Sequence, residues 1–327
     1  MVRRLAYFLI AFCIVLAIPF SIVELPDWLL LIGLFGGRLY ILSIDPLLQN
    51  ERRMFWASVI LWGVVHVIVS VVDAPARAFI GLPLLSLPLI YWLMSRFSNI
   101  TEQWMNLSFR VTTILMGIAG WFLTHLGESE LGAFAIPICI LIVASHTYRA
   151  FSDRNDNRTL TAHWVALAIL LWIGAGLLAA MVLFMSAGYW VRDTLILTVL
   201  TEWMRYAALA VILAMGNQIT ADIRGENRRV TGLSAYWLFA FGVIIGRLVM
   251  VYAGILQLSP LHQFEPSPAA INEWFRLIWL AGFWNIAILL GLIIYAVQIF
   301  IRRPPGLLSL NSEPCLPHSP SPHSESE

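Results

Sequence analysis

The stretch that decides the fold reads Gly242-Val-Ile-Ile-Gly246-Arg247-Leu248 and lies within a long apolar run from Thr231 to Leu256. A similar stretch, Gly33-Leu-Phe-Gly36-Gly37-Arg38-Leu39, lies in an early apolar run. Glycines four residues apart let a neighbouring helix approach closely in lipid. An arginine deep in hydrocarbon must find a partner or water. The two stretches therefore predict a membrane protein with a polar interior.

The composition points to the same class of protein. Of the 327 residues, 60% are hydrophobic and only 12% are charged, whereas a soluble domain carries about 25% charged residues. All 20 basic residues are arginine, so retinal or pyridoxal chemistry that needs a lysine amine is excluded. The net charge of +1 gives no indication of nucleic-acid binding. The three cysteines lie far apart and form no metal-binding spacing.

The hydropathy pattern predicts an all-α, polytopic transmembrane helical bundle. A spanning helix needs about 20 apolar residues, and the sequence predicts about ten such spans, with eight or nine as the alternative. Pro83 and Pro88 should kink the fourth span. Residues 1–303 form the predicted transmembrane domain, and the Ser/Pro/Glu-rich residues 304–327 form a predicted disordered cytoplasmic tail. The predicted spans are 5–23, 28–45, 54–72, 78–95, 109–126, 131–148, 163–185, 195–216, 232–256 and 277–300.

The distribution of arginine predicts the orientation of this bundle. With the amino terminus inside, the inner segments hold 14 arginines, the outer connections hold 3 and the spans hold 3. This bias matches the positive-inside rule, so both termini are predicted to be cytoplasmic in a multi-pass protein of the inner or plasma membrane. The longer connections include a predicted inner loop, Asn217–Thr231, and a predicted outer loop, Gln257–Arg276, whose prolines indicate an ordered cap.

Polar residues on several spans fall at a similar depth. Counted from the outer end of each span at about 1.5 Å per residue, these depths run from about 9 to about 15 Å. If the helices meet, these side chains line one pocket with three guanidiniums, one carboxylate, an imidazole and an amide. The predicted ligand-binding residues are Arg38, His66, Glu202, Arg205, Arg247 and Asn285.

The charges in this predicted pocket do not cancel. Glu202 can neutralise Arg247 across a helix pair or Arg205 within its own helix, and at least one further arginine then needs a counter-charge. An anion from outside or a lipid phosphate would supply it through bidentate hydrogen bonds. The leading hypothesis is a transport or ligand-binding protein for an anionic small molecule or lipid headgroup. Glu202 would tune the charge or carry a proton, and His66 could couple the site to pH.

Two structural readings compete with this hypothesis. Intramembrane arginines often bond helix-end carbonyls or reach an interface. The chain could also be a structural subunit of a larger membrane complex, in which case internal salt bridges would occupy the whole cluster. A membrane-bound lipid-modifying enzyme is a further alternative, but no acidic or nucleophilic pair for it is visible.

The histidines support one alternative with a cofactor. His66 and His125 fall toward the outer side, and His146 and His163 fall toward the inner side. Two pairs at opposite faces are what a b-type cytochrome with two haems requires, although these four lie on four different spans. Haem b therefore belongs to the alternative of a redox subunit, and the leading hypothesis predicts no cofactor.

Overall fold

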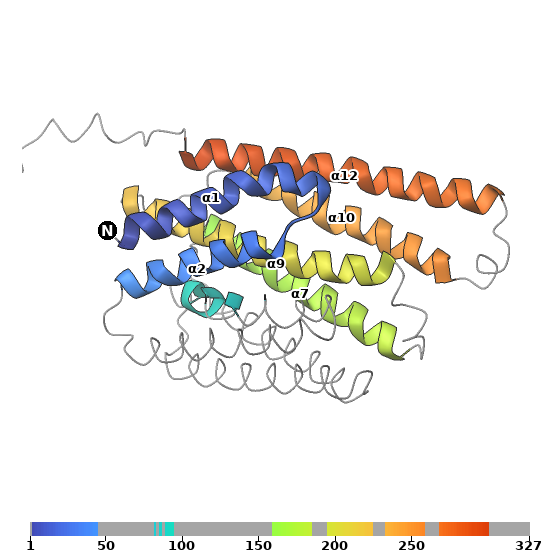
Figure 1. The fold of residues 1–327 in the computed structure, drawn as a ribbon, viewed down its shortest axis with the longest axis horizontal. Coiled ribbons are helices and arrows are strands. Elements are labelled where there is room, and N and C mark those ends of the chain that lie inside the picture. Colours follow the sequence, from blue (N-terminus) through green and yellow to red (C-terminus); the bar gives the residue numbers. More distant parts are fainter. Residues whose placement is uncertain are drawn as a thin grey trace, which may run out of the picture.

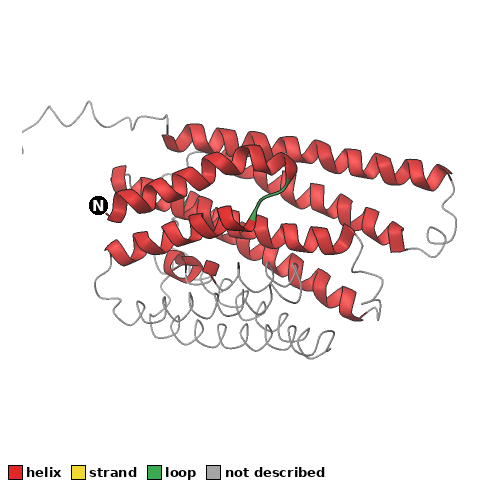
Figure 2. Cartoon of the chain, in the orientation of Figure 1, coloured by secondary structure: helices red, strands yellow, loops and turns green. Residues whose placement is uncertain are grey.

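A computed structural model describes residues 2–44, 82, 85–86, 89–94, 159–184, 195–224, 233–258 and 268–300 of the chain. The described residues are helical apart from short connecting pieces, and no strand occurs among them (Figures 1 and 2). A short helical piece covers 89–94. The six long helices are α1 (Val2–Val23), α2 (Asp27–Ile44), α7 (Leu160–Phe184), α9 (Leu195–Arg224), α10 (Leu233–Leu258) and α12 (Pro268–Phe300).

Five of these helices are long and apolar enough to cross a membrane, namely α1, α7, α9, α10 and α12. The all-helical prediction is confirmed for the described residues, and five of their helices could span a membrane. The predicted spans 54–72, 109–126 and 131–148 lie outside the described residues, as does half of 78–95. The count of about ten spans therefore stays a prediction.

The first and last described helices begin and end at the same end of the bundle. The ring centroids of Tyr7 in α1 and Phe300 in α12 lie 6.3 Å apart. In Figure 1 the start of α1 and the end of α12 lie at the same end of the described bundle. The turn between α1 and α2 lies toward the opposite end of the bundle. We call that end the outer end, in keeping with the predicted orientation. The position of both termini in the cytoplasm stays a prediction.

Close packing of α10 on α12 follows from glycine. A Cβ added to Gly242 would lie 2.9 Å from the backbone nitrogen of Ile288 and 3.0 Å from the carbonyl oxygen of Trp284. A Cβ on Gly291 of α12 would in turn lie 2.8 Å from the backbone nitrogen of Phe239. Only the absence of a side chain lets the two backbones approach this closely. The prediction that the Gly242–Gly246 stretch is a helix-packing site is confirmed.

The early glycine stretch packs in the same way. A Cβ on Gly36 of α2 would lie 3.2 Å from the carbonyl oxygen of Ala6 in α1. A Cβ on Gly33 would lie 2.7 Å from Cδ1 of Ile212 in α9 and 2.8 Å from the Cys13 sulfur in α1. Helix α2 therefore lies between α1 and α9, with small residues at both contacts.

Helix α9 is the centre of the described bundle. Every residue from Tyr206 to Gly216 is buried, so this stretch is covered on all its faces. From α12, the fully buried Tyr295 reaches α9, where its hydroxyl donates a hydrogen bond to the Leu213 carbonyl next to Gly216. The middle of α9 is apolar, and polar groups gather toward its two ends.

The structure corrects the boundaries of two predicted loops. Helix α9 continues to Arg224, past the predicted start of the inner loop at Asn217. Polar residues extend this helix because they find partners: Asn217 donates to the Thr161 hydroxyl over 2.8 Å, and Thr220 donates to the Gly216 carbonyl over 2.7 Å. Helix α12 begins at Pro268, inside the predicted outer loop, and proline suits a first helical position because its missing N–H needs no acceptor there.

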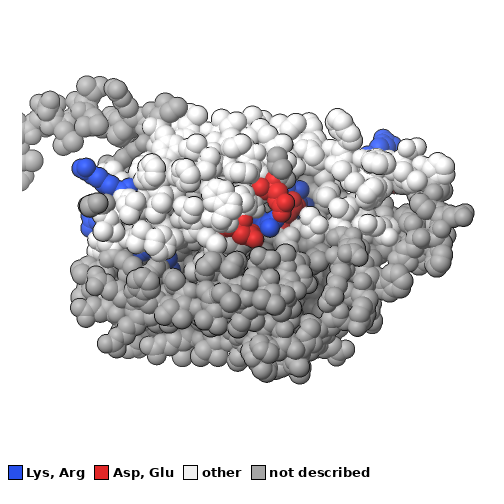
Figure 3. All heavy atoms as spheres, in the orientation of Figure 1, with Lys and Arg blue, Asp and Glu red and all other residues white. Residues whose placement is uncertain are grey.

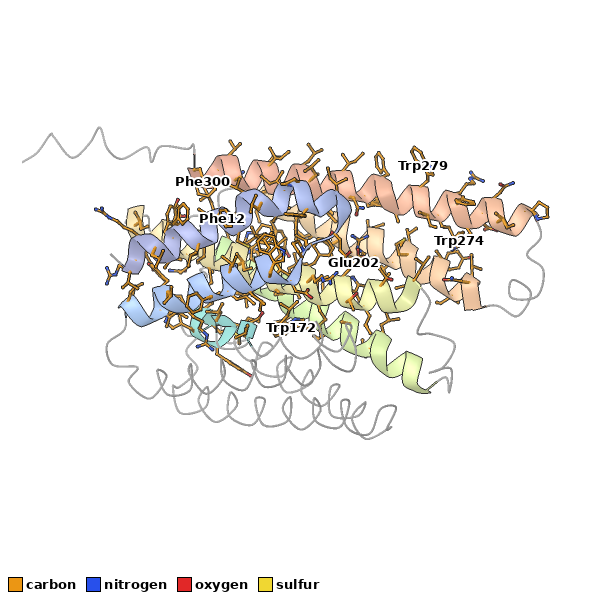
Figure 4. All side chains as sticks on the ribbon, in the orientation of Figure 1. Phe12, Trp172, Glu202, Trp274, Trp279 and Phe300 are labelled. Atoms are coloured by element: carbon orange, nitrogen blue, oxygen red, sulfur yellow. The ribbon has the colours of Figure 1, made fainter. Side chains whose placement is uncertain are left out.

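The helices differ in length, and their outward surface is apolar. Helix α1 has 22 residues and α12 has 33, which correspond to about 33 Å and about 50 Å. Helix α12 therefore continues well beyond the α1–α2 turn (Figure 1). Beyond the exposed Asn272, Glu273 and Arg276 of its first turns, the outward side chains of α12 are mostly large and apolar. Trp279 is 82% exposed and points away from the bundle (Figure 4). Such a surface suits hydrocarbon and the membrane interface.

Candidate functional site

Three of the predicted site residues come together from three helices. Glu202 lies in α9, Arg247 in α10 and Asn285 in α12. The Nε of Arg247 lies 2.9 Å from Oε2 of Glu202, and Nη2 of Arg247 donates to Oδ1 of Asn285 over 3.2 Å. Figure 4 shows Glu202 inside the bundle, near the middle of its long axis. We call the group formed by Glu202, Tyr206, Arg247 and Asn285 the α9–α10–α12 site.

Tyr206 is the member of this site that the sequence reasoning missed. The Nη2 of Arg247 donates to the Tyr206 hydroxyl over 3.0 Å, and the guanidinium carbon lies 5.1 Å from the centre of the Tyr206 ring. The signal was its spacing, because Tyr206 follows Glu202 by four residues and therefore shares its helix face. A tyrosine looks like an ordinary aromatic residue of a membrane helix until Arg247 is placed beside it.

The glycine packing brings this site together. Gly246 precedes Arg247, and a Cβ on Gly246 would lie 2.9 Å from Cβ of Trp284, the neighbour of Asn285. The absence of a side chain at Gly246 thus lets α12 come close enough for Asn285 to reach the guanidinium. The glycine motif and the polar site thus depend on each other: Gly246 sets the distance between α10 and α12, and Arg247 reaches Asn285 across that distance.

The contact between Arg247 and Glu202 rests on charge alone. Although Nε and Oε2 are 2.9 Å apart, the N–H bond is not directed at that oxygen, and neither atom has a hydrogen-bond partner. The side chains are 5% and 17% exposed. Among the described residues, the other terminal nitrogen of Arg247, Nη1, also has no hydrogen-bond acceptor. The guanidinium therefore keeps hydrogen-bonding capacity that its present partners do not use.

Arg205 turns to a different set of partners. It follows Glu202 by one helical turn, and its Nε donates to Oδ1 of Asp27 over 2.8 Å, while its Nη1 is paired with Glu24. Glu24 lies in the α1–α2 turn and Asp27 is the first residue of α2, so both carboxylates lie at the connection of α1 and α2 beside α9. Figure 3 shows acidic and basic side chains gathered over this connection; elsewhere on the described part of this face, charged side chains lie toward the two ends.

The charge of this region differs from the sequence-based expectation. We expected an excess of guanidiniums, with an arginine that only a ligand could neutralise. In the structure, the guanidiniums of Arg205 and Arg247 face three carboxylates, from Glu24, Asp27 and Glu202. Span-by-span depth overlooked the turn, because Glu24 and Asp27 lie just outside the predicted spans.

Arg38 lies far from the α9–α10–α12 site. Its neighbour Gly37 packs on Met215, since a Cβ there would lie 3.4 Å from Cγ of Met215. Met215 follows Glu202 by 13 residues of the same helix, which is about 20 Å along the axis. Arg38 is buried, at 5% exposure, and belongs to the inner half of the bundle. The depth estimate for Arg38 was therefore wrong.

The candidate histidines divide between described and undescribed residues. His66, His125 and His146 lie outside the described residues. His163 lies at the start of α7, where its Nδ1 is 2.9 Å from the Thr159 carbonyl oxygen and its ring packs on Tyr236. It is near Thr161, at the inner end, and thus apart from Glu202. Within the described helices, no group of three or more His, Cys, Asp or Glu residues could hold a metal ion.

A second polar group occupies the inner end of α9. The Tyr40 hydroxyl donates to Oδ2 of Asp222 over 2.9 Å, and Gln218 donates to Oδ1 of Asp222 over 2.9 Å. With the Asn217–Thr161 hydrogen bond, these contacts join α2, α7 and α9. Uncharged side chains supply most of this group, so a search for intramembrane charges did not find it.

Comparison with known proteins gives no family for this chain: no protein-family model matches the sequence, and a search of curated proteins finds no significant match.

Proposed function

We propose that the chain is a membrane transport or ligand-binding protein whose α9–α10–α12 site binds a small anion. The observation that carries the proposal is the state of Arg247, which is buried, held to Glu202 by charge without a directed hydrogen bond, and left with an unused Nη1 among the described residues. In this proposal Glu202 is an internal anion that an external one replaces.

The energetics of buried ion pairs support a functional role for this pair. Removing two charges from water is costly, and exchanging a buried ion pair for apolar residues is often neutral or stabilising. Helix packing in this region is already provided by Gly242, Gly246 and Gly291. An ionisable pair inside a membrane helix bundle is accordingly a reason to look for a ligand or a proton.

The geometry favours a carboxylate or a phosphate as the ligand. A guanidinium presents its N–H groups in a planar fork that matches two oxygens of such an anion. The Tyr206 hydroxyl and the Asn285 amide, both within 3.2 Å of Nη2, add groups that can orient the anion. A free anion and a lipid phosphate share this chemistry, so we propose the class and leave the source to the experiment.

Charge balance couples this binding to a proton. Arg247 and Glu202 neutralise each other, so an anion that takes the guanidinium leaves the Glu202 carboxylate as an excess negative charge. Protonation of Glu202 restores neutrality, and binding should strengthen as the pH falls. Within the described helices and turns, the groups around this carboxylate are Arg247 on α10, Tyr206 and Arg205 on α9, Asn285 on α12 and Glu24 on the α1–α2 turn.

The test is anion binding and uptake by the full chain in proteoliposomes, with radiolabelled inorganic phosphate and succinate as probes. Arg247→Gln should abolish binding, and Glu202→Gln should allow it with a weaker dependence on pH. Asp222→Asn at the inner end is the matched control and should retain binding. Uptake by Arg247→Gln at the wild-type rate would refute the proposal. A phosphate-bearing lipid that competes with inorganic phosphate would identify a headgroup as the ligand.

A structural subunit of a larger membrane complex is the second candidate. The observation that favours it is that Arg205 and Arg247 both have carboxylate partners within the chain. In this case Arg247→Gln would lower the recovery of the chain with a partner, and neither probe anion would bind to the wild type.

A further inference from the structure

The clamp formed by Arg205, Glu24 and Asp27 suggests how the α9–α10–α12 site is regulated. Glu202 and Arg205 lie one helical turn apart on α9, a spacing at which a glutamate and an arginine can pair. They do not pair in this structure, because Arg205 is held by Glu24 and by Asp27 at 2.8 Å. Glu202 instead lies 2.9 Å from Arg247.

The Arg205–Glu24–Asp27 clamp is exposed, whereas the Glu202–Arg247 pair is buried. The side chain of Glu24 is 62% exposed and that of Asp27 is 33% exposed, whereas Arg205 is 15% exposed. Exposed ion pairs are weak and exchange with water readily. Leu25, between the two acids, is buried at 3%, so the turn is anchored while its charged side chains can release Arg205.

We propose that Arg205 is a switch that decides which arginine Glu202 neutralises. While Glu24 and Asp27 hold Arg205, Glu202 stays on Arg247 and the site is closed. When they release it, Arg205 draws the Glu202 carboxylate across one turn of α9, and the Arg247 guanidinium becomes free for an anion. This inference rests on the proposed function, because it assigns a regulator to the same site.

The competing explanation is mechanical. If the clamp merely holds the α1–α2 turn against α9, any break in it opens the site. The two explanations differ for Arg205→Gln, which breaks the clamp and also removes the competitor for Glu202. A switch then leaves Glu202 on Arg247 and the site closed, whereas a mechanical lid opens.

Thiol labelling tests this without any ligand. In a full-length protein with Cys139→Ser and Cys315→Ser, Asn285→Cys places a thiol beside Arg247, and the fully buried Cys13 serves as an internal control. The readout is the rate at which a membrane-impermeant maleimide labels position 285. Glu24→Gln with Asp27→Asn should raise this rate about fivefold or more, and the two single variants should raise it less. Arg205→Gln should leave the rate near that of the parent.

The outcomes separate the two proposals. Equal acceleration by Arg205→Gln and by the double variant would overturn the switch in favour of a lid, and unchanged rates in every variant would also overturn it. Labelling of Cys13 would show that a variant has lost its fold. If the double variant does so, the labelling rates of the two single variants are compared with the parent instead. The expected pattern without phosphate or succinate binding would leave the switch standing and count against the proposed function.

Discussion

Replacing Gly242 with alanine should destabilise the bundle, although alanine favours helices. The added Cβ would lie 2.7 Å from Cγ1 of Ile288, 2.9 Å from its backbone nitrogen and 3.0 Å from the Trp284 carbonyl oxygen. Two of these neighbours are backbone atoms, so α10 and α12 must separate. Overpacking of this kind costs about 1–3 kcal/mol, and the helix propensity of alanine returns up to about 1 kcal/mol. With the full propensity gain, the net loss should be up to about 2 kcal/mol.

Gly282 on α12 provides the matched control. A Cβ there would meet nothing within 4 Å, so Gly282→Ala should keep the propensity gain and stabilise the protein by up to about 1 kcal/mol. The assay is the free energy of unfolding in detergent micelles, measured by denaturant titration with tryptophan fluorescence. Equal shifts of the same sign for the two variants would refute the reasoning that Gly242 is required for backbone contact.

Two further predictions concern buried polar contacts. Arg247→Gln and Glu202→Gln should each cost about 3–5 kcal/mol because each leaves a buried charge unpaired, and the double variant should be less destabilised than their sum; an additive double-mutant cycle would mean that the charges are not coupled. Tyr295→Phe removes the hydrogen bond to the Leu213 carbonyl and should cost about 1 kcal/mol, measured by the same titration. Tyr252→Phe on the exposed face of α10 is the control. Equal losses of stability in the two variants would contradict this prediction.

The features that the sequence predicted well are local ones. Glycines at a spacing of four residues beside an arginine indicate close packing whatever the partner helix is, and both stretches pack as expected. Glu202, Arg247 and Asn285 were grouped by depth, and the structure joins them. Depth succeeded here because α9, α10 and α12 all extend past the α1–α2 turn.

The depth estimate failed where two helices begin or end at different heights in the bundle. Depth was counted from the outer end of each span, which places Arg38 beside Arg247 only if α2 and α10 end together. The structure places Asp27, at the start of α2, beside Arg205, so α2 begins about where the site lies and Arg38 falls toward the inner end. Depth also says nothing about rotation around a helix axis, and for this reason Arg205 could not be assigned to Glu24 and Asp27.

The unequal lengths of α1 and α12 have a consequence for the surrounding lipid. A hydrocarbon core of about 30 Å matches the 22 residues of α1, but the 33 residues of α12 exceed it by about 20 Å. The first turns of α12 carry the exposed Asn272, Glu273 and Arg276, but the uncharged stretch from 277 to 300 is still about 36 Å long. The membrane must thicken along α12, or α12 must tilt, and either adjustment has an elastic cost that depends on acyl chain length. Bilayer thickness is therefore a variable to which this protein should respond.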